Sequence, residues 1–300
     1  MNNAIPPTDL GWKKWVLGSR PRTLPAAVVP VMVGAACASA GNAVWWRVSL
    51  ALVVSLALQV GVNYANDYSD GIKGTDAVRV GPLRLVGSGV AKASDVKRAA
   101  FIALGVAAIA GLVLAFVTTF WLLAVGAAAI LAAWTYTGGP RPYGYAGLGE
   151  VFVFVFFGLV ATVGTQYIVS EELTSTGWVA SIVVGCYACA LLVVNNLRDI
   201  PGDTEANKRT LAVKMGDART RQFFGLLIVI AAVGIIAVGI HTQAFAMLGL
   251  VGVIATRPAL NDIARGAKGR DLIPVLGAVG RAQMILAVTF TIGLVIALQS

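Results

Sequence analysis

Nine runs of mostly apolar residues recur along the chain, and their length constrains its fold more than any other feature. A run of about 20 apolar residues matches the hydrocarbon thickness of a bilayer when it forms an α-helix. With 58% hydrophobic and 12% charged residues, the composition also lies outside the range of soluble domains. The sequence therefore predicts an all-α, polytopic membrane protein of about nine transmembrane helices, and we expect the first and eighth to be short. The runs lie near residues 24–41, 48–66, 98–117, 119–137, 148–169, 178–197, 222–240, 243–256 and 282–298.

Basic residues gather in alternate connections between these runs. Cytoplasmic segments of membrane proteins are enriched in Lys and Arg. If the N-terminus is cytoplasmic, all of the 23 bases except Arg47 fall in cytoplasmic segments. We therefore expect an interfacial segment at residues 1–22 and an intramembrane domain at residues 23–300, surrounded by the lipid of a prokaryotic inner membrane. The net charge of +9 then suits anionic headgroups and substrates, and nucleic acid need not be invoked.

Two acidic segments follow apolar runs that end on the predicted cytoplasmic side. The first covers residues 66–76 and the second covers residues 195–203, and Lys208 and Arg209 come soon after the second. Carboxylates packed this closely repel one another unless a cation lies among them. Mg²⁺ commonly binds through one or two carboxylates together with the phosphates of a substrate. The two acidic segments therefore predict a membrane enzyme that acts on a diphosphate, with its site facing the cytoplasm.

The spacing in the first segment indicates which side chains meet. On a helix, Asn66 and Asp70 share a face while Asp67 turns away. Two glycines follow, and we expect them to break the helix, so that Asp76 folds back towards the site. Lys73 is then placed to meet phosphate oxygens.

The second segment has a similar design, with an Asn and an Asp at the end of an apolar run and then a second Asp. Asn196 and Asp199 share a helical face, but Pro201 disfavours helix at the residue before it. We therefore expect Asp203 to reach the site from a turn. Asp70 and Asp199 are separated by about four helices, which predicts two pseudo-repeated halves that bring both segments to one cavity mouth.

The two segments resemble the aspartate-rich motifs of the UbiA-type intramembrane prenyltransferases, and the resemblance spans most of the chain. The motif residues are Asn66, Asp70, Lys73, Gly74 and Asp76, and Asn196, Asp199, Asp203, Thr210, Leu211 and Ala212. Further stretches are similar to the 1,4-dihydroxy-2-naphthoate polyprenyltransferases of menaquinone biosynthesis. These stretches are residues 20–26 (RPRTLPA), 81–86 (GPLRLV), 136–140 (YTGGP) and 147–150 (GLGE). The Lys that usually follows the YTGGP stretch is absent, and Arg141 stands nearby.

The resemblance implies an activity and a set of site residues. It implies transfer of a polyprenyl group from polyprenyl diphosphate to 1,4-dihydroxy-2-naphthoate, with loss of diphosphate and CO₂ and formation of demethylmenaquinone. Mg²⁺ is the implied cofactor. The residues expected to bind the metal and to act in catalysis are Asn66, Asp70, Asp76, Asp199 and Asp203. Those expected to contact the diphosphate or the acceptor are Lys73, Arg84, Arg141, Lys208, Arg209, Tyr136, Glu150 and Asn196.

Other polar residues allow more than one interpretation. His241, the only histidine, falls on the predicted outer side, which argues against a role as catalytic base. Cys186 and Cys189 lie in an apolar run and are expected to pack rather than to bind metal. Glu150 either interacts with a helix dipole or orients the aromatic acceptor. Tyr136 either lines the acceptor site or belongs to an interfacial belt, and its motif favours the first interpretation.

Three rival functions remain. Another member of the same superfamily would prenylate 4-hydroxybenzoate, haem or a chlorophyll precursor, and only the branch-like stretches argue against it. An ion-coupled transporter usually places its carboxylates near the bilayer midplane, whereas these lie at helix ends. A CDP-alcohol phosphotransferase would carry a motif of the D-G-x-x-A-R type, which the sequence lacks. The sequence leaves open the prenyl chain length, the oligomeric state and the division of the carboxylates among metal ions.

Overall fold

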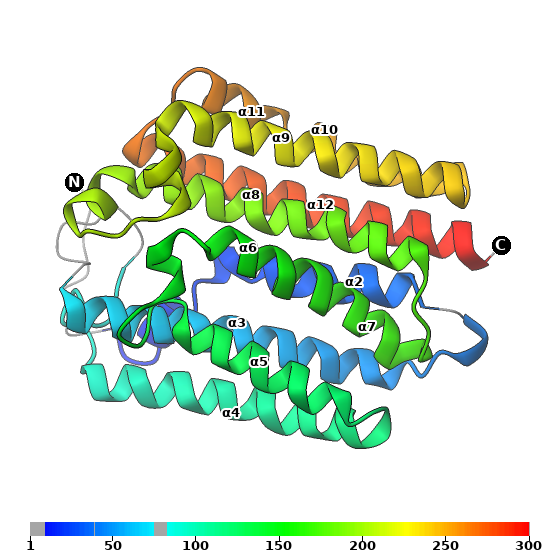
Figure 1. Ribbon diagram of the computed structural model, residues 1–300, viewed down its shortest axis with the longest axis horizontal. Coiled ribbons are helices and arrows are strands. Elements are labelled where there is room, and N and C mark those ends of the chain that lie inside the picture. Colours follow the sequence, from blue (N-terminus) through cyan, green and yellow to red (C-terminus); the bar gives the residue numbers. More distant parts are fainter. Residues whose placement is uncertain (1–9, 39, 75–82, 300) are drawn as a thin grey trace.

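The computed structural model describes residues 10–38, 40–74 and 83–299, and within these residues the regular structure is helical, with no strand. The long helices lie side by side along a common direction (Figure 1). The helices are α1 (Lys13–Gly18), α2 (Pro25–Ala36), α3 (Trp46–Lys73), α4 (Ala93–Val117), α5 (Trp121–Thr135), α6 (Gly149–Val153), α7 (Ala161–Ser170), α8 (Ser175–Glu205), α9 (Leu211–His241), α10 (Leu250–Ala255), α11 (Arg257–Ala264) and α12 (Leu272–Gln299).

Seven helical segments are long and apolar enough to cross a membrane, so the chain is an all-helical membrane protein as predicted. α2 and α5 are also apolar but shorter, with 12 and 15 residues. Each of the nine predicted runs overlaps a helix, while nine crossings of the membrane remain a prediction. The two short helices are the first and the fourth, whereas the sequence predicted the first and the eighth. The eighth continues from Ala244 to Ala264 because Pro258 stands in the first turn of α11, where its missing N–H is tolerated.

α8 forms the centre of the bundle and is the most deeply buried of the candidate spans. It packs against α2, α9 and α12, and against the π-helical turn Phe154–Val160 that joins α6 to α7. Glycines permit this close approach, as in many membrane bundles. A Cβ atom added to Gly158 would lie 2.6 Å from the Cα atom of Gly185. The packing therefore fixes α8, and with it the second acidic segment, relative to the helices around it.

α3 and α8 end on the same side of the bundle, so both acidic segments lie there (Figure 1). The opposite end holds Arg47, whose Nη1 donates to Glu171 Oε1 at 2.8 Å. His241 also lies at that end, where its Nε2 is 3.3 Å from Ser175 Oγ. The helical rise along α8 places Ser175 roughly 36 Å from Asp199. The structure thus confirms that the only histidine is remote from the acidic segments.

The helix ends at the acidic segments differ in part from the prediction. α8 continues to Glu205, so the expectation that Asp203 lies on a turn is wrong. Pro201 removes one backbone donor from the last turns, but its ring lies on an exposed face and the helix continues past it. Asp203 therefore follows Asp199 by four residues on one helical face. In the first segment the helix passes Gly71 and ends at Lys73, and the next residue, Gly74, has a φ of 72°. Asp76 lies outside the described residues.

Candidate active site

A cavity of about 770 Å³ lies between α2, α3, α5, α7 and α8 and reaches both acidic segments. The predicted site residues that line it are Asn66, Asp70, Arg84, Tyr136, Asn196, Asp199, Asp203 and Lys208. The fold thus brings the two acidic segments to one cavity, as their spacing predicted. The internal duplication itself remains a prediction.

Asp70 of the first acidic segment contacts Lys208, which follows the second segment. It is 3% exposed, and its Oδ1 accepts hydrogen bonds from Tyr145 Oη at 2.5 Å and from Lys208 Nζ at 3.1 Å. Arg84 Nη2 lies 3.7 Å from Oδ2 of the same carboxylate. Lys208 Nζ also lies 4.8 Å from the centre of the Tyr145 ring. One buried carboxylate therefore has two cationic groups beside it at the polar end of the cavity.

Asp199 is held by the residue that precedes it. Arg198 donates from Nε to Asp199 Oδ1 at 2.7 Å and from Nη2 to Oδ2 at 2.8 Å, and Nη2 also donates to Asn195 Oδ1 at 2.9 Å. The Arg198 side chain is only 1% exposed. The sequence analysis assigned no role to Arg198. Its position on an apolar helix was nevertheless a signal, because an arginine there needs a buried acceptor, and Asn195 and Asp199 both offer one. Arg198 thereby fixes the direction of the Asp199 carboxylate.

The two asparagines are also oriented by neighbours. Asn66 Oδ1 accepts a hydrogen bond from Thr137 Oγ1 at 2.8 Å. Asn196 Nδ2 donates to Glu150 Oε1 at 2.9 Å. Glu150 is 4% exposed and is not among the residues that line the cavity. Glu150 therefore stands behind Asn196, so the structure supports a contact with Asn196 rather than one with the acceptor.

Asp67 points away from Asp70, as helical spacing predicted. Its Oδ2 accepts from the backbone N–H of Leu85 at 2.8 Å and its Oδ1 accepts from that of Val86 at 3.0 Å. The absence of a side chain on Gly71 lets Leu85 and Val86 approach α3, because a Cβ atom added to Gly71 would lie 2.4 Å from Val86 Cγ1. Asp67 and Gly71 thus place the neighbouring Arg84 beside the cavity.

Three predicted phosphate ligands do not line the cavity, although Lys73 Nζ lies 4.9 Å from the centre of the Tyr145 ring beside it. Lys73 Nζ donates to the carbonyl oxygens of Thr137 at 2.7 Å and Gly139 at 3.4 Å, so it ties the end of α3 to the connection after α5. Arg141 and Arg209 are exposed. None of these three bases lines the cavity. Of Lys208 and Arg209, which the sequence could not separate, the structure brings only Lys208 to the carboxylates.

Aromatic residues of the connection between α5 and α6 form one wall. Tyr136 lines the cavity, which agrees with the first interpretation of its motif, and its ring lies 5.4 Å from that of Tyr143. Tyr143 Oη donates to the carbonyl oxygen of Ala132 at 2.9 Å, and its ring stacks on Phe152 at 3.9 Å. Burial raises the pKa of the Tyr143 phenol above its usual range, so the hydroxyl stays protonated.

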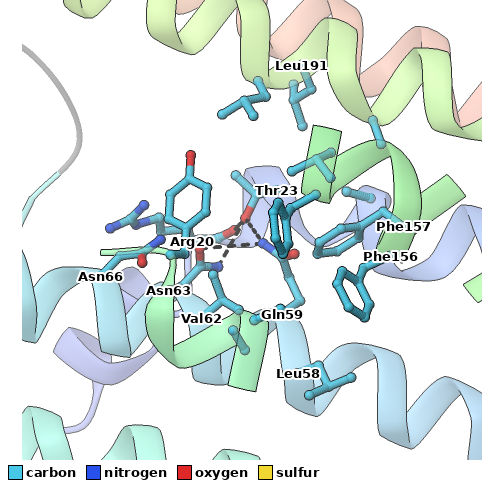
Figure 2. Close-up of a pocket in the computed structure, with 18 of the residues that line it drawn as sticks. Arg20, Thr23, Leu58, Gln59, Val62, Asn63, Asn66, Phe156, Phe157 and Leu191 are labelled. Carbon is cyan, nitrogen blue, oxygen red and sulfur yellow. Dashed lines mark hydrogen bonds between the residues drawn. The ribbon is translucent and has the colours of Figure 1, made fainter. Parts of the chain in front are cut away.

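Beyond the polar end, the cavity is lined mostly by apolar side chains. Phe156 and Phe157 project from the π-helical turn and lie across from Asn63 and Asn66 of α3 (Figure 2). The apolar lining continues along α4 and α5 through Gly111, Leu114, Leu122, Val125, Gly126 and Ala129. A cavity with anion-binding bases at one end and a long apolar wall suits an amphiphile that has an anionic head and a hydrocarbon tail.

The donor set at the polar end fits a hard divalent cation. Among the predicted site residues that line the cavity, those that offer carboxylate or amide oxygens are Asn66, Asp70, Asn196, Asp199 and Asp203. In the part of the chain that the structure describes, no group of three or more His, Cys, Asp or Glu residues is arranged to hold a metal ion. Mg²⁺ needs no such group, because it keeps several water ligands and binds through one or two carboxylates plus substrate phosphates. The residues therefore fit Mg²⁺ that arrives with a diphosphate.

Comparisons with known proteins agree with this geometry. Residues 27–271 match the model of the UbiA prenyltransferase family. The chain is similar to the 1,4-dihydroxy-2-naphthoate octaprenyltransferase of Mycobacterium tuberculosis, with 50% identity over 91% of this chain and 94% of that protein. It is similar to the protein of the same name from Escherichia coli, with 34% identity over 88% of this chain and 94% of the relative.

Solved structures share the fold. A UbiA homolog from Archaeoglobus fulgidus bound to GPP and Mg²⁺ has a TM-score of 0.62 and 13% identity, over 92% of this chain and 99% of that one. An apo UbiA homolog from Aeropyrum pernix K1 has a TM-score of 0.67 and 14% identity, over 89% of this chain and 95% of that one. Together with the family match across most of the sequence, these findings show that the chain belongs to the UbiA prenyltransferase family.

Proposed function

We propose that the protein transfers a polyprenyl group from polyprenyl diphosphate to 1,4-dihydroxy-2-naphthoate, with release of diphosphate and CO₂, giving demethylmenaquinone. The observation that carries the proposal is the meeting of Asp70, Asp199 and Lys208 at the polar end of a largely apolar cavity. The names of the relatives from Mycobacterium tuberculosis and Escherichia coli support this acceptor over 4-hydroxybenzoate, haem or a chlorophyll precursor.

Mg²⁺ would bind at the polar end together with the diphosphate. The residues that would hold it are Asn66, Asp70, Asn196, Asp199 and Asp203, and Asp76 belongs to the proposed set through its motif. The ion would neutralise charge on the diphosphate and weaken its bond to the prenyl group. The Archaeoglobus fulgidus relative was solved with GPP and Mg²⁺, which supports this assignment.

Lys208 and Arg84 would stabilise the leaving group. When the bond between the allylic carbon and oxygen breaks, its electron pair stays on the diphosphate. Fixed positive charges beside that oxygen lower the barrier, because they are already in place when the negative charge develops. Both bases flank Asp70, whose direction is set by the Tyr145 hydroxyl. The exposed Arg141 and Arg209 would act only at the entrance.

The apolar walls would hold the prenyl chain and protect the electron-poor allylic carbon. Phe152, Phe156 and Phe157 line this part of the cavity and exclude water that would otherwise hydrolyse the donor. The electron-rich acceptor attacks through the ring carbon that bears its carboxylate, and a new carbon–carbon bond forms. The bond to the carboxylate then breaks, CO₂ leaves, and the electron pair restores the aromatic ring. This sequence needs no strong protein base, which fits the remote position of His241.

The charge distribution supports a site that faces the cytoplasm. Arg47, the one base assigned to the outer side, does lie at the end of the bundle opposite Asp70, where it pairs with Glu171. Within the proposed interfacial segment at residues 1–22, Trp12 is 72% exposed, and α1 is tied to α3 by a hydrogen bond of 2.7 Å from Tyr64 Oη to the Trp15 carbonyl oxygen. We therefore retain the N-terminus and both acidic segments on the cytoplasmic side.

Product analysis by mass spectrometry tests the proposal. Purified protein, a polyprenyl diphosphate, Mg²⁺ and 1,4-dihydroxy-2-naphthoate should give a prenylated naphthoquinol that lacks the carboxylate. Parallel reactions with 4-hydroxybenzoate and with a haem precursor serve as acceptor controls. A product from 4-hydroxybenzoate alone would assign the chain to another branch, and a decarboxylated product without a prenyl group would contradict prenyl transfer.

A further inference from the structure

Arg20 brings a guanidinium group to the wall of the cavity, outside both acidic segments. Its Nη2 atom is buried and has no hydrogen-bond partner among the described residues. A buried cationic donor without an acceptor is unfavourable by itself. The residue also has a φ of 53° and a ψ of 71°, in the left-handed region that residues other than glycine seldom adopt. Surrounding structure therefore holds Arg20 in a conformation that is unfavourable for an isolated arginine.

A polar network, formed by Thr23, Gln59 and Asn63, holds the Arg20 backbone. Asn63 Nδ2 donates to the carbonyl oxygen of Ser19 at 2.8 Å, and Thr23 Oγ1 donates to that of Arg20 at 3.0 Å. The same Thr23 hydroxyl accepts from Asn63 Nδ2 and from Gln59 Nε2, each at 3.1 Å (Figure 2). Asn63 and Gln59 are only 3% and 7% exposed. Their amide groups thus fix the chain on both sides of the Arg20 peptide.

The network extends the polar wall of the cavity deeper along α3. Gln59, Asn63 and Asn66 follow one another at helical spacings of four and three, so they share one face and span about 10 Å. All three line the cavity, as does Arg20. Figure 2 shows Gln59 between the polar side chains and Phe156, with Phe157 nearby. The cavity therefore has the Arg20 guanidinium and the polar side chains on one side and the rings of Phe156 and Phe157 on the other.

We propose that Arg20 binds the carboxylate of the aromatic acceptor and that the Thr23–Gln59–Asn63 network positions Arg20 for this contact. The inference rests on the proposed function, in which the acceptor is an aromatic acid. A guanidinium group matches a carboxylate through two parallel hydrogen bonds. Lys208 and Arg84 already lie beside Asp70 at the diphosphate end, so separate bases bind the anions of the two substrates.

The Arg20 guanidinium would also attract a diphosphate oxygen. Two inhibitors that differ only in a carboxylate show which of the two anions, the acceptor carboxylate or the diphosphate, Arg20 binds. The inhibition constants of 1-hydroxy-2-naphthoate and of 1-naphthol are measured with the wild-type protein and with Arg20→Gln. Loss of one charged hydrogen-bonding pair should raise the constant for the acid by about tenfold or more. The constant for 1-naphthol and the KM for prenyl diphosphate should each change less than twofold. The KM for 1,4-dihydroxy-2-naphthoate should rise in parallel with the constant for the acid.

Three further variants complete the test. Arg20→Lys keeps the charge but loses the bidentate geometry, so it should bind the acid with intermediate affinity. Asn63→Ala should weaken the binding of 1-hydroxy-2-naphthoate without changing that of 1-naphthol, because Asn63 acts through the position of Arg20. Arg98→Gln is the control, since this arginine on α4 has a side chain that is 80% exposed. Thermal unfolding in detergent checks that each variant is folded, and Arg20→Lys decides the question if Arg20→Gln does not fold.

Other outcomes overturn the inference. A rise in the KM for prenyl diphosphate with an unchanged constant for the acid would assign Arg20 to the diphosphate. Equal losses for the acid and for 1-naphthol would indicate a change of cavity shape. A wild-type protein that prenylates no naphthoate would contradict the proposed function itself, whereas an active protein with unaltered acid binding in Arg20→Gln would contradict only the carboxylate subsite.

Discussion

Lys208 Nζ lies 3.1 Å from Asp70 Oδ1 although the two residues are 138 positions apart, and this buried contact joins the first acidic segment to the residues that follow the second. A charge buried in a protein is strongly unfavourable unless a partner compensates it. Before substrate binds, the carboxylate and the ammonium group compensate each other. A diphosphate and Mg²⁺ would offer each of them a new partner, so the contact marks the place where both would bind.

Replacement of the carboxylates tests the metal assignment. Asp70→Asn and Asp199→Asn keep the side-chain shape but remove a charged ligand, so each should lower turnover by at least about 10²-fold. Thermal unfolding in detergent checks that each variant is folded, because Asp70→Asn leaves Lys208 and Arg84, and Asp199→Asn leaves Arg198, without a compensating buried charge. Turnover is measured as Mg²⁺-dependent product formation, and His241→Ala should leave it nearly unchanged. A folded Asp variant with near-normal, Mg²⁺-dependent transfer would show that the diphosphate site lies elsewhere.

Two adjacent bases provide a matched comparison at the second segment. Lys208 is 7% exposed and contacts Asp70, whereas Arg209 is exposed to solvent. Lys208→Met should lower kcat/KM for prenyl diphosphate by about 10²-fold, because it removes a fixed charge beside the leaving group. Arg209→Met should lower it by less than about threefold, in line with the small effects of solvent-screened charges. Steady-state kinetics at several ionic strengths compares the two variants. Equal losses of kcat/KM in Lys208→Met and Arg209→Met would contradict the assignment of Lys208 to the leaving group.

Local spacing predicted much of the fold and part of the site. Run length and composition are local properties, so the positions of the helices followed from them. The shared face of Asn66 and Asp70, and the turning away of Asp67, followed from the helical period. The missed features depend on contacts between distant segments. Lys73 bonds to carbonyl groups that the connection after α5 supplies, and no pattern within its own segment indicates this.

The exposed position of Pro201 likewise explains why α8 does not stop there. The sequence preference against helix before a proline is real, but here the ring lies on an exposed face and the helix continues for another turn. Arg198 was missed because Lys and Arg near helix ends usually reach solvent, whereas this one is buried against Asp199. Both the continuation of α8 past Pro201 and the contact of Arg198 with Asp199 therefore depend on which residues are buried in the folded protein, and no local sequence pattern indicates this.

The hydrogen bond between Glu150 and Asn196 predicts a coupled effect on Mg²⁺. Because Glu150 Oε1 accepts from Asn196 Nδ2, it selects the amide orientation in which Asn196 Oδ1 remains available to a cation. Glu150→Leu, which removes the acceptor, and Asn196→Ala should each raise the Mg²⁺ concentration for half-maximal activity several-fold. The double variant should be no worse than the poorer single variant, as expected for residues that act through one contact. Additive effects in this cycle would mean that Glu150 acts independently.

Labelling at Ser175 tests the orientation in the membrane. This exposed residue begins α8 at the end of the bundle opposite the acidic segments. The native Cys37, Cys186 and Cys189 are all buried, so they should contribute little background. Ser175→Cys should react with an impermeant maleimide added to the outside of intact cells. Reaction only from the cytoplasmic side of inverted vesicles would reverse the proposed topology.

The contacts of Arg47 predict a stability effect that is separate from activity. Its Nη1 donates to the carbonyl oxygen of Ile168 at 2.9 Å and its Nη2 donates to that of Val117 at 2.8 Å, so it joins the ends of α4 and α7 to the start of α3. Arg47→Leu should lower the free energy of unfolding by at least about 2 kcal/mol, because buried carbonyl groups lose charged donors.

Glu171 is the matched control, since its side chain is 55% exposed although it pairs with Arg47 at 2.8 Å. An ion pair with one solvated partner contributes little, so Glu171→Gln should lower the free energy of unfolding by less than about 1 kcal/mol. Unfolding is followed by tryptophan fluorescence in mixed detergent micelles. Both variants should keep the wild-type KM for prenyl diphosphate, because they lie at the far end of the bundle. If Glu171→Gln proved as damaging as Arg47→Leu, the ion pair rather than the two carbonyl contacts would hold this end together.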